Sequence, residues 1–226
     1  METLKKHLAS FRLRAEFWRL EYFSRSRARD FTTIKSKRIP VVLVAGIYAS
    51  GKSLRPLKKF LEQKGWPVSL APAEKNYAAV PILAKKLEAR ILALPAKKVQ
   101  IVAHSLGGIT ALVALKNPKV FAKVAQVITL GSPLQGCALG KFAFWELKKN
   151  RDFVAPNSKK IQALTANPKI NRKFRSLRAH FDPIVFPPEV SILPGAQENR
   201  ALAVVGHIAL ILSPTVWRAV VKRLLK

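Results

Sequence analysis

The chain has 226 residues, of which 49% are hydrophobic and 23% charged, a balance that excludes an intrinsically disordered polypeptide and suits one globular domain with a sizeable core. Its 41 Lys and Arg residues against 12 Asp and Glu residues give a formal net charge of +29, which favours anionic partners such as a lipid surface or nucleic acid. The single cysteine, Cys137, excludes an intramolecular disulfide and a thiolate metal cluster.

The first 38 residues differ from the rest of the chain. Apolar side chains recur along them at steps of four and three, at Leu4, Leu8, Phe11, Ala15, Trp18 and Tyr22. This spacing predicts an amphipathic helical extension over residues 1–38 with a basic opposite face, either lying on a membrane interface or packing on the protein itself or on a partner subunit. Charges interrupt the stretch too often for a secretory signal, and the apolar run at 201–212 is too short to cross a membrane. We therefore expect a cytoplasmic or peripherally membrane-associated protein.

From residue 39 onward, short apolar runs alternate with stretches of helical periodicity. We expect strands at 39–46, 66–72, 99–105 and 124–133, and helices at 53–65, 77–94, 106–117 and from 213 onward. This alternation predicts an α/β fold with a mostly parallel central sheet and helices on both faces. Residues 39–226 are therefore expected to form a single α/β domain.

Residues 134–176 interrupt the alternation. The segment is rich in Lys and Arg and also carries Phe142, Phe144, Trp145 and Phe153. We predict a short cap or lid insertion here, between the strand ending near residue 131 and the strand before Asp182. A plain crossover that covers the sheet is the alternative.

The loop "AGIYASGKSL", residues 45–54, follows the first expected strand and has the glycine, lysine and serine spacing of a phosphate-binding P-loop. A P-loop enzyme also needs an aspartate at the end of another strand to hold Mg²⁺. The chain has three aspartates, Asp30, Asp152 and Asp182, and none of them ends the third or fourth expected strand. The sequence therefore favours another use for this loop.

The run "IVAHSLGG" places Ser105 between an expected strand and an expected helix, with Ala103 and Gly107 two residues before and after it. Small residues are needed at these two positions because a nucleophile elbow brings backbones together. The pattern predicts that Ser105 is a catalytic nucleophile rather than a serine that only caps the next helix.

An activated serine needs a histidine base and an acid that orients it, and in the hydrolase arrangement the chain order is serine, acid, histidine. Of the four histidines, only His207 follows all three aspartates. Asp182 comes directly after an expected strand, whereas Asp152 lies in the basic segment, where a solvated ion pair explains it better. The separations of 77 residues from Ser105 to Asp182 and 25 from Asp182 to His207 leave room for the insertion and one more strand. We predict the triad Ser105, Asp182 and His207.

Acyl transfer through a serine produces an oxyanion that backbone N–H groups stabilise. One N–H comes from the residue after the nucleophile, here Leu106, and the other from the loop after an early strand, where Ile47 is placed. The glycine loop at 45–54 is then explained as an oxyanion loop. Four further side chains are expected to contact the substrate: Tyr48, His104, Phe142 and Trp145.

With these motifs the sequence resembles the α/β-hydrolase superfamily, and within it the bacterial lipases and esterases, including those similar to GPI inositol-deacylases. The resemblance covers residues 39–226 and is carried by "VVLVAGIYASG", "IVAHSLGGITALVAL", "VITLGSPLQGCALGKF", "DFVAPNSKKIQAL", "FDPIV" and "GHIALILSPTVW". Where the family usually has His-Gly in the first motif, this chain has Ala45 and Gly46, which removes a polar residue that helps to hold the oxyanion loop. The resemblance implies an α/β-hydrolase fold, apolar acyl esters as substrates, and chemistry that needs no metal or organic cofactor.

The sequence therefore predicts a serine carboxyl-ester hydrolase, an esterase or lipase, that acts on a lipid or small-molecule ester through an acyl-enzyme on Ser105. An acyltransferase or thioesterase with the same triad is the first alternative. A non-catalytic basic binding module is the second, and the intact order of the triad argues against it and against a nucleic-acid partner. The positive charge leads us to expect peripheral contact with an anionic membrane surface.

Overall fold

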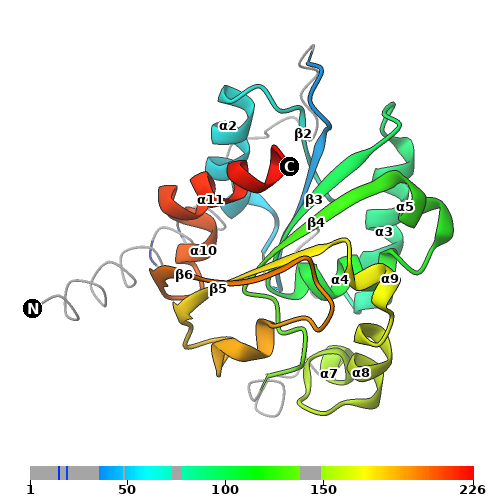
Figure 1. The fold of residues 1–226 in the computed structure, drawn as a ribbon, viewed down its shortest axis with the longest axis vertical. Coiled ribbons are helices and arrows are strands. Elements are labelled where there is room, and N and C mark those ends of the chain that lie inside the picture. Colours follow the sequence, from blue (N-terminus) through cyan, green and yellow to red (C-terminus); the bar gives the residue numbers. More distant parts are fainter. Residues whose placement is uncertain (1–14, 16–18, 20–35, 48, 73–77, 138–148) are drawn as a thin grey trace, which may run out of the picture.

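The computed structural model describes residues 15, 19, 36–47, 49–72, 78–137 and 149–226 (Figure 1). These residues contain one six-stranded sheet. Its strands are β1 (Val41–Val44), β2 (Val68–Leu70), β3 (Val99–His104), β4 (Val124–Leu130), β5 (Phe174–Phe181) and β6 (Glu198–Val205). The sheet order is β2-β1-β3-β4-β5-β6, and every neighbouring pair is parallel. The predicted mostly parallel sheet is confirmed.

Helices cover both faces of the sheet. They are α2 (Arg55–Gln63), α3 (Val80–Ala93), α4 (Leu106–Ala114), α5 (Pro118–Lys123), α7 (Arg151–Val154), α8 (Lys159–Thr165), α9 (Pro168–Asn171), α10 (Ala209–Leu212) and α11 (Pro214–Leu224), with short 3-10 turns η2 (Lys52–Leu54) and η4 (Pro188–Ser191). Figure 1 shows α2, α10 and α11 on one side of the sheet and α3, α4 and α5 on the other. The expected two-faced arrangement is therefore present.

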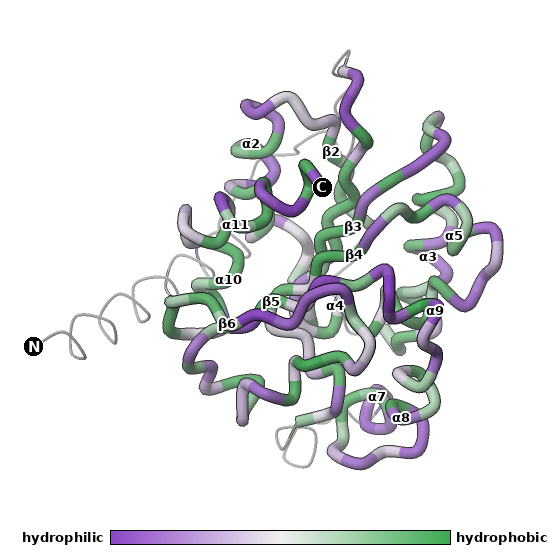
Figure 2. Tube along the Cα trace, viewed as in Figure 1, coloured by the Kyte–Doolittle hydropathy of each residue, from purple (hydrophilic) through white to green (hydrophobic). Residues whose placement is uncertain are grey.

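Burial on both faces explains the composition of the central strands. β1 reads VVLV and is buried throughout, as is the whole of β3. One core cluster includes Ile101 and Leu112 beneath α3 and α4, and the other includes Leu43 and Ile211 beneath α2, α10 and α11. Figure 2 shows hydrophobic residues along β3 and β4 and a hydrophilic start to the edge strand β6. Continuous apolar runs of this kind are typical of parallel strands covered on both sides.

The parallel arrangement gathers the carboxyl ends of the strands at one edge of the sheet. The neighbouring strands β3, β4, β5 and β6 end at His104, Leu130, Phe181 and Val205. Ser105 follows the end of β3, Asp182 follows the end of β5, and His207 comes two residues after β6. The topology therefore brings all three predicted triad residues to the edge where parallel sheets usually carry their sites.

One helix boundary differs from the sequence prediction. Asn117 and Pro118 are expected to end a helix, but they begin α5 instead. The Asn117 side chain accepts a hydrogen bond from the Lys119 N–H, and Pro118 occupies the first helical position. Proline fits that position because the N–H that it lacks has no intrahelical partner there. The preceding helix, α4, already ends at Ala114.

The described part of the predicted insertion packs on the core. Phe153 and Leu164 are buried in the cluster beneath α3 and α4, and Asn150 Oδ1 accepts a hydrogen bond from the first backbone N–H of α3. The insertion ends earlier than expected, because β5 begins at Phe174. Residues 138–148 lie outside the described residues, so a cap over the site stays a prediction.

The expected amphipathic extension over residues 1–38 lies almost entirely outside the described residues and stays a prediction. Its last residues are described, and they contact the end of α2. The Ser36 hydroxyl donates a hydrogen bond to the Gly65 carbonyl, and the Arg38 guanidinium lies 4.1 Å from the centroid of the Trp66 ring. None of the helices in the described part of the chain is long and apolar enough to cross a bilayer.

An ion pair fixes the edge strand β6 to α11. The guanidinium of Arg223, whose side chain is 5% exposed, donates from Nε to Glu198 Oε2 at 2.8 Å and from Nη2 to Oε1 at 2.5 Å. The hydrogen bond from Arg223 holds the pKa of Glu198 below its usual value, although partial burial opposes this. Since an edge strand pairs with a neighbour on one side only, this pair helps to hold the strand that leads to His207.

We expect Glu198→Gln to lower the free energy of unfolding at pH 7 by about 2 kcal/mol, because it removes charge-assisted hydrogen bonds to a buried guanidinium. The folded pKa of Glu198 lies below the unfolded value of about 4.3, so the contribution is complete above that pH and disappears as the pH falls through the folded value. Urea unfolding at a series of pH values measures both effects. Glu189→Gln is the control, since Glu189 is exposed and lies 3.9 Å from Arg178; an equal loss in both variants would contradict the assignment.

Candidate active site

Ser105 occupies a strained turn between β3 and α4. Its backbone has φ 54° and ψ −126°, a conformation that residues with a side chain rarely adopt. The Ser105 N–H donates to the Leu130 carbonyl at 3.0 Å, and its own carbonyl accepts from the Gly108 N–H at 3.0 Å. The turn is therefore held between the neighbouring strand β4 and the first turn of α4. This is the strand, turn and helix that a nucleophile elbow requires.

Backbone packing against the end of β1 explains the glycines around the turn. A Cβ at Gly107 would lie 2.8 Å from the Val44 carbonyl oxygen and 2.9 Å from that of Ala45. A Cβ at Gly46 would lie 2.8 Å from the Cβ of Ser105. Cβ atoms do not approach other atoms so closely in real structures. The loop after β1 can therefore lie directly against the serine turn only because glycine stands at both positions.

The two backbone donors predicted for an oxyanion site lie at this contact. Ile47 follows Gly46 in the loop, and Leu106 is the first residue of α4. Within the described residues, neither of their N–H groups donates a hydrogen bond. An unpaired N–H is expected at the start of a helix, where the helix dipole also favours negative charge. Both donors are therefore available to an oxygen atom bound beside Ser105.

Asp182 and His207 form a buried hydrogen-bonded pair. Asp182 Oδ2 accepts from His207 Nδ1 at 2.7 Å, with side-chain exposures of 2% and 5%. The other carboxylate oxygen, Oδ1, accepts from the backbone N–H groups of Ile184 and Val185 at 2.8 and 2.9 Å. Because an ionised carboxylate only accepts, Nδ1 of His207 carries the hydrogen and Nε2 remains available as a base.

The residues that follow β4 lie between the serine turn and the Asp182–His207 pair. Gly131 has φ +59°, and a Cβ there would lie 3.3 Å from Asp182 Oδ2, 3.4 Å from His207 Nδ1 and 2.5 Å from Leu210. On the other side, a Cβ at Gly108 would lie 2.2 Å from Ser132 Oγ. Sequence patterns do not single out Gly131, although the run "LGSP" at the end of the strand expected at 124–133 carries the signal.

His104 lies against His207 rather than on an open surface. It is 4% exposed, its ring centroid lies 4.5 Å from that of His207, and its Nε2 is 3.3 Å from the His207 carbonyl oxygen. Burial and the neighbouring His207 lower the pKa of His104 well below its usual value, and the hydrogen bond to the His207 backbone opposes them. His104 is therefore neutral and donates from Nε2. Its expected contact with substrate stays a prediction.

The structure records no hydrogen bond between the Ser105 hydroxyl and the His207 imidazole within the described residues. His104 lies next to both residues, since it precedes Ser105 in the chain and its ring packs against the His207 ring. Catalytic hydrogen bonds are often long in the absence of substrate and shorten when it binds. The arrangement is therefore that of a serine, an oriented imidazole and a buried carboxylate at one edge of the sheet.

The remaining candidate residues lie elsewhere or outside the description. Tyr48, Phe142 and Trp145 fall outside the described residues. Asp152 is exposed and lies 3.7 Å from Lys160, as expected for a solvated ion pair. Lys52 begins the 3-10 turn η2. In the part of the chain that is described, no three His, Cys, Asp or Glu side chains are grouped as metal ligands would be.

Comparison with known proteins identifies the fold. A family model described as a PGAP1-like alpha/beta domain matches residues 84–150, which include most of α3, the Ser105 turn and β4. Aspergillus fumigatus lipase B is similar with a TM-score of 0.73 and 18% identity over 88% of this chain. The mature form of Bacillus licheniformis lipase BlEst2 has a TM-score of 0.65 and 16% identity over 83% of this chain and 92% of its own. The protein has the α/β-hydrolase fold.

A membrane phospholipase A described as a bacterial virulence factor also shares the α/β-hydrolase fold, with a TM-score of 0.57 and 15% identity over 84% of this chain and 79% of its own. This chain spans 55% of the length of the Aspergillus fumigatus lipase. The predicted α/β-hydrolase fold is confirmed by these likenesses and by the parallel sheet.

We expect Gly107→Ala to destabilise the protein by about 1–3 kcal/mol, because the added methyl meets two backbone carbonyls that cannot move aside without shifting β1. The same shift should displace Ser105 and slow its labelling by a fluorophosphonate probe, which reacts with activated serines. Urea unfolding and labelling kinetics check the two effects. Native values in both measurements would contradict the close contact.

The buried, neutral state of His104 predicts a pH effect on stability. The unfolded histidine binds a proton near pH 6.5, whereas the folded one does not, so native stability should decrease as the pH falls through about 6.5. His104→Ala should lower stability at pH 7 and should also flatten this decrease between about pH 6.5 and 5. Urea unfolding across this range measures it. His180→Ala, at an exposed position of β5, is the control and should keep the native slope.

Proposed function

We propose that the protein is a serine carboxyl-ester hydrolase with Ser105 as nucleophile, His207 as base and Asp182 as the orienting acid. The observation that carries the proposal is the buried Asp182–His207 hydrogen bond of 2.7 Å at the same sheet edge as the strained serine turn. The lipase and esterase structures with the same fold are consistent with ester hydrolysis in general.

The proposed reaction proceeds in two steps. Ser105 Oγ attacks the acyl carbonyl while His207 Nε2 takes its proton, and the imidazolium returns that proton to the leaving alcohol. Water then attacks the acyl-enzyme while His207 takes its proton, and the imidazolium gives that proton to Ser105 Oγ as the acid is released. Asp182 stabilises the imidazolium in both steps through Nδ1. The Ile47 and Leu106 N–H groups bind the oxyanion of each tetrahedral intermediate, and one such donor contributes about 3 kcal/mol.

The proposed substrate is an apolar acyl ester. A small hollow beside the oxyanion loop is lined by Val44, Ala45, Ala71, Pro72, Leu83, Leu87 and Thr110, and it has room for about one water molecule. Ile47 packs against the core cluster that contains Val44 and Leu87. Six of the seven residues that line the hollow are apolar, so the surroundings of the loop favour an acyl group over a sugar or nucleotide.

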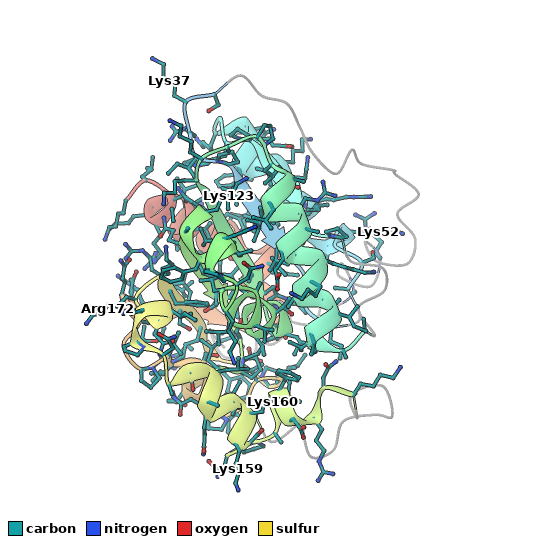
Figure 3. All side chains as sticks on the ribbon, turned by 90° about the vertical axis from the view of Figure 1, so that its right-hand side faces the viewer. Lys37, Lys52, Lys123, Lys159, Lys160 and Arg172 are labelled. Atoms are coloured by element: carbon teal, nitrogen blue, oxygen red, sulfur yellow. The ribbon has the colours of Figure 1, made fainter. Side chains whose placement is uncertain are left out.

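The proposed partner is an anionic lipid surface. In the described residues each carboxylate side chain already contacts a basic group: Glu62 with Lys58, Glu88 with Lys85, Asp152 with Lys160, Asp182 with His207, Glu189 with Arg178 and Glu198 with Arg223. Figure 3 shows the labelled cations Lys37, Lys52, Lys159 and Arg172 at widely separated places on one view of the molecule. The excess positive charge therefore attracts anionic surfaces over about a Debye length.

Ser105→Ala should reduce the hydrolysis of p-nitrophenyl esters by about 10⁴-fold or more, because the residual rate of a triad enzyme without its nucleophile is small. His207→Ala should have a similar effect, whereas His180→Ala should keep native activity. Rates with esters from acetate to palmitate, measured by release of p-nitrophenol, test the proposal. Equal rates for the native protein and Ser105→Ala would contradict it. Acyl transfer to an added alcohol in excess of free acid would instead support the acyltransferase alternative.

A further inference from the structure

A cluster of exposed apolar side chains lies beside the candidate site. The described residues include seven large hydrophobic side chains that are exposed: Ile39, Ile82, Leu92, Phe181, Ile184, Phe186 and Leu225. Three of the seven, Phe181, Ile184 and Phe186, fall within six consecutive residues, with exposures of 40%, 36% and 52%. We call these three side chains the apolar rim. Exposed apolar groups that cluster in this way usually mark a binding surface.

The rim is held in place by the acid of the candidate site. Asp182 is buried between Phe181 and Ile184, and its Oδ1 accepts hydrogen bonds from the backbone N–H groups of Ile184 and Val185. The Phe181 and Phe186 rings lie edge to face with centroids 6.3 Å apart. Exposure of the rim is therefore a property of a fixed loop, which points these side chains outward while Asp182 and Val185 point inward.

Charge and geometry together indicate that the apolar rim binds a membrane rather than another protein. The net charge of +29 opposes association of two copies through this face. In residues 181–191 the exposed carboxylate is Glu189, which lies 3.9 Å from Arg178. Charge attracts the protein to an anionic surface, and Lys37, Lys52, Lys159 and Arg172 lie far apart in the view of Figure 3. The rim is the feature in the described residues that can select one orientation.

We propose that the apolar rim inserts among the lipids of an anionic membrane and turns the candidate active site toward it. Phe181 and Ile184 flank Asp182, so insertion of the rim places the carboxyl edge of the sheet at the depth of the lipid head groups. An ester in the membrane then reaches Ser105 without first leaving the lipid phase. The docking itself is independent of catalysis, while its use in presenting substrate rests on the proposed hydrolase function.

Flotation with vesicles tests the docking in the full chain carrying Ser105→Ala, which prevents lipid turnover. Phosphatidylcholine vesicles with and without phosphatidylglycerol are compared at low and high salt. The rim variant is Phe181→Ser with Phe186→Ser. The matched control is Ile82→Ser with Leu92→Ser, which removes two exposed apolar side chains from α3 instead. The same pairs of changes in the chain with Ser105 intact are assayed on a water-soluble p-nitrophenyl ester and on an ester dispersed in vesicles.

We expect the rim variant to bind phosphatidylglycerol vesicles about tenfold more weakly or worse, since tenfold corresponds to about 1.4 kcal/mol, less than burial of one Phe side chain contributes. The control should stay within about twofold of the parent. Hydrolysis of the soluble ester should be retained by the rim variant, while hydrolysis of the vesicle ester should fall with binding. Single Phe186→Ala is assayed in parallel and should show a smaller loss of binding in the same direction.

Unchanged binding of the rim variant, or an equal loss in the control, would overturn the proposal. A change in oligomeric state by light scattering, with vesicle binding retained, would assign the rim to a protein contact and also overturn it. If the rim variant loses soluble-ester activity and unfolds at a lower urea concentration, the single change Phe186→Ala decides instead. Vesicle binding of Phe186→Ala equal to that of the parent would then overturn the proposal. Absence of activity on every ester in the native chain would refute the proposed function and leave the binding result intact.

Discussion

Close backbone packing between the serine turn and the end of β1 is the constraint on which the proposed site depends. Ser105 has a positive φ, and the turn fits beside the carbonyls of Val44 and Ala45 only because Gly107 has no side chain. Gly46 meets Ser105 from the other side. The same contact therefore positions both the proposed nucleophile, Ser105, and the proposed oxyanion donors, the N–H groups of Ile47 and Leu106.

Sequence patterns predict the sheet and the three triad candidates but not the contacts that join them. Alternating apolar runs are sufficient to predict parallel strands. Chain order selects His207, and the position directly after an expected strand favours Asp182 over Asp152. The start of α5 is missed because Asn117 and Pro118 suit a helix start as well as a helix end. His104, at the end of β3, and Gly131, after β4, lie against the Asp182–His207 pair that follows β5 and β6. Such contacts depend on strand order, which local periodicity does not encode.

The charge and the hydrophobicity of this molecule act at different ranges. The net charge of +29 acts over about a Debye length, and the described carboxylates that would offset it already contact basic groups. The exposed rings of Phe181 and Phe186 act only on contact. Asp182 lies within the same loop, which means that the residue ordering the imidazole also sets the outward direction of the rings.

The positions of the proposed catalytic groups along the chain have a consequence for biosynthesis. Ser105, Asp182 and His207 follow β3, β5 and β6, and β6 is the edge strand of the sheet. Non-local parallel pairing is slow to form, because loops must close before contacts stabilise them. A nascent or truncated chain that stops before β6 lacks His207, the proposed base. If the proposed triad acts as described, ester hydrolysis begins only when the sheet is complete, so that a half-made chain cannot cleave esters in the cell that produces it.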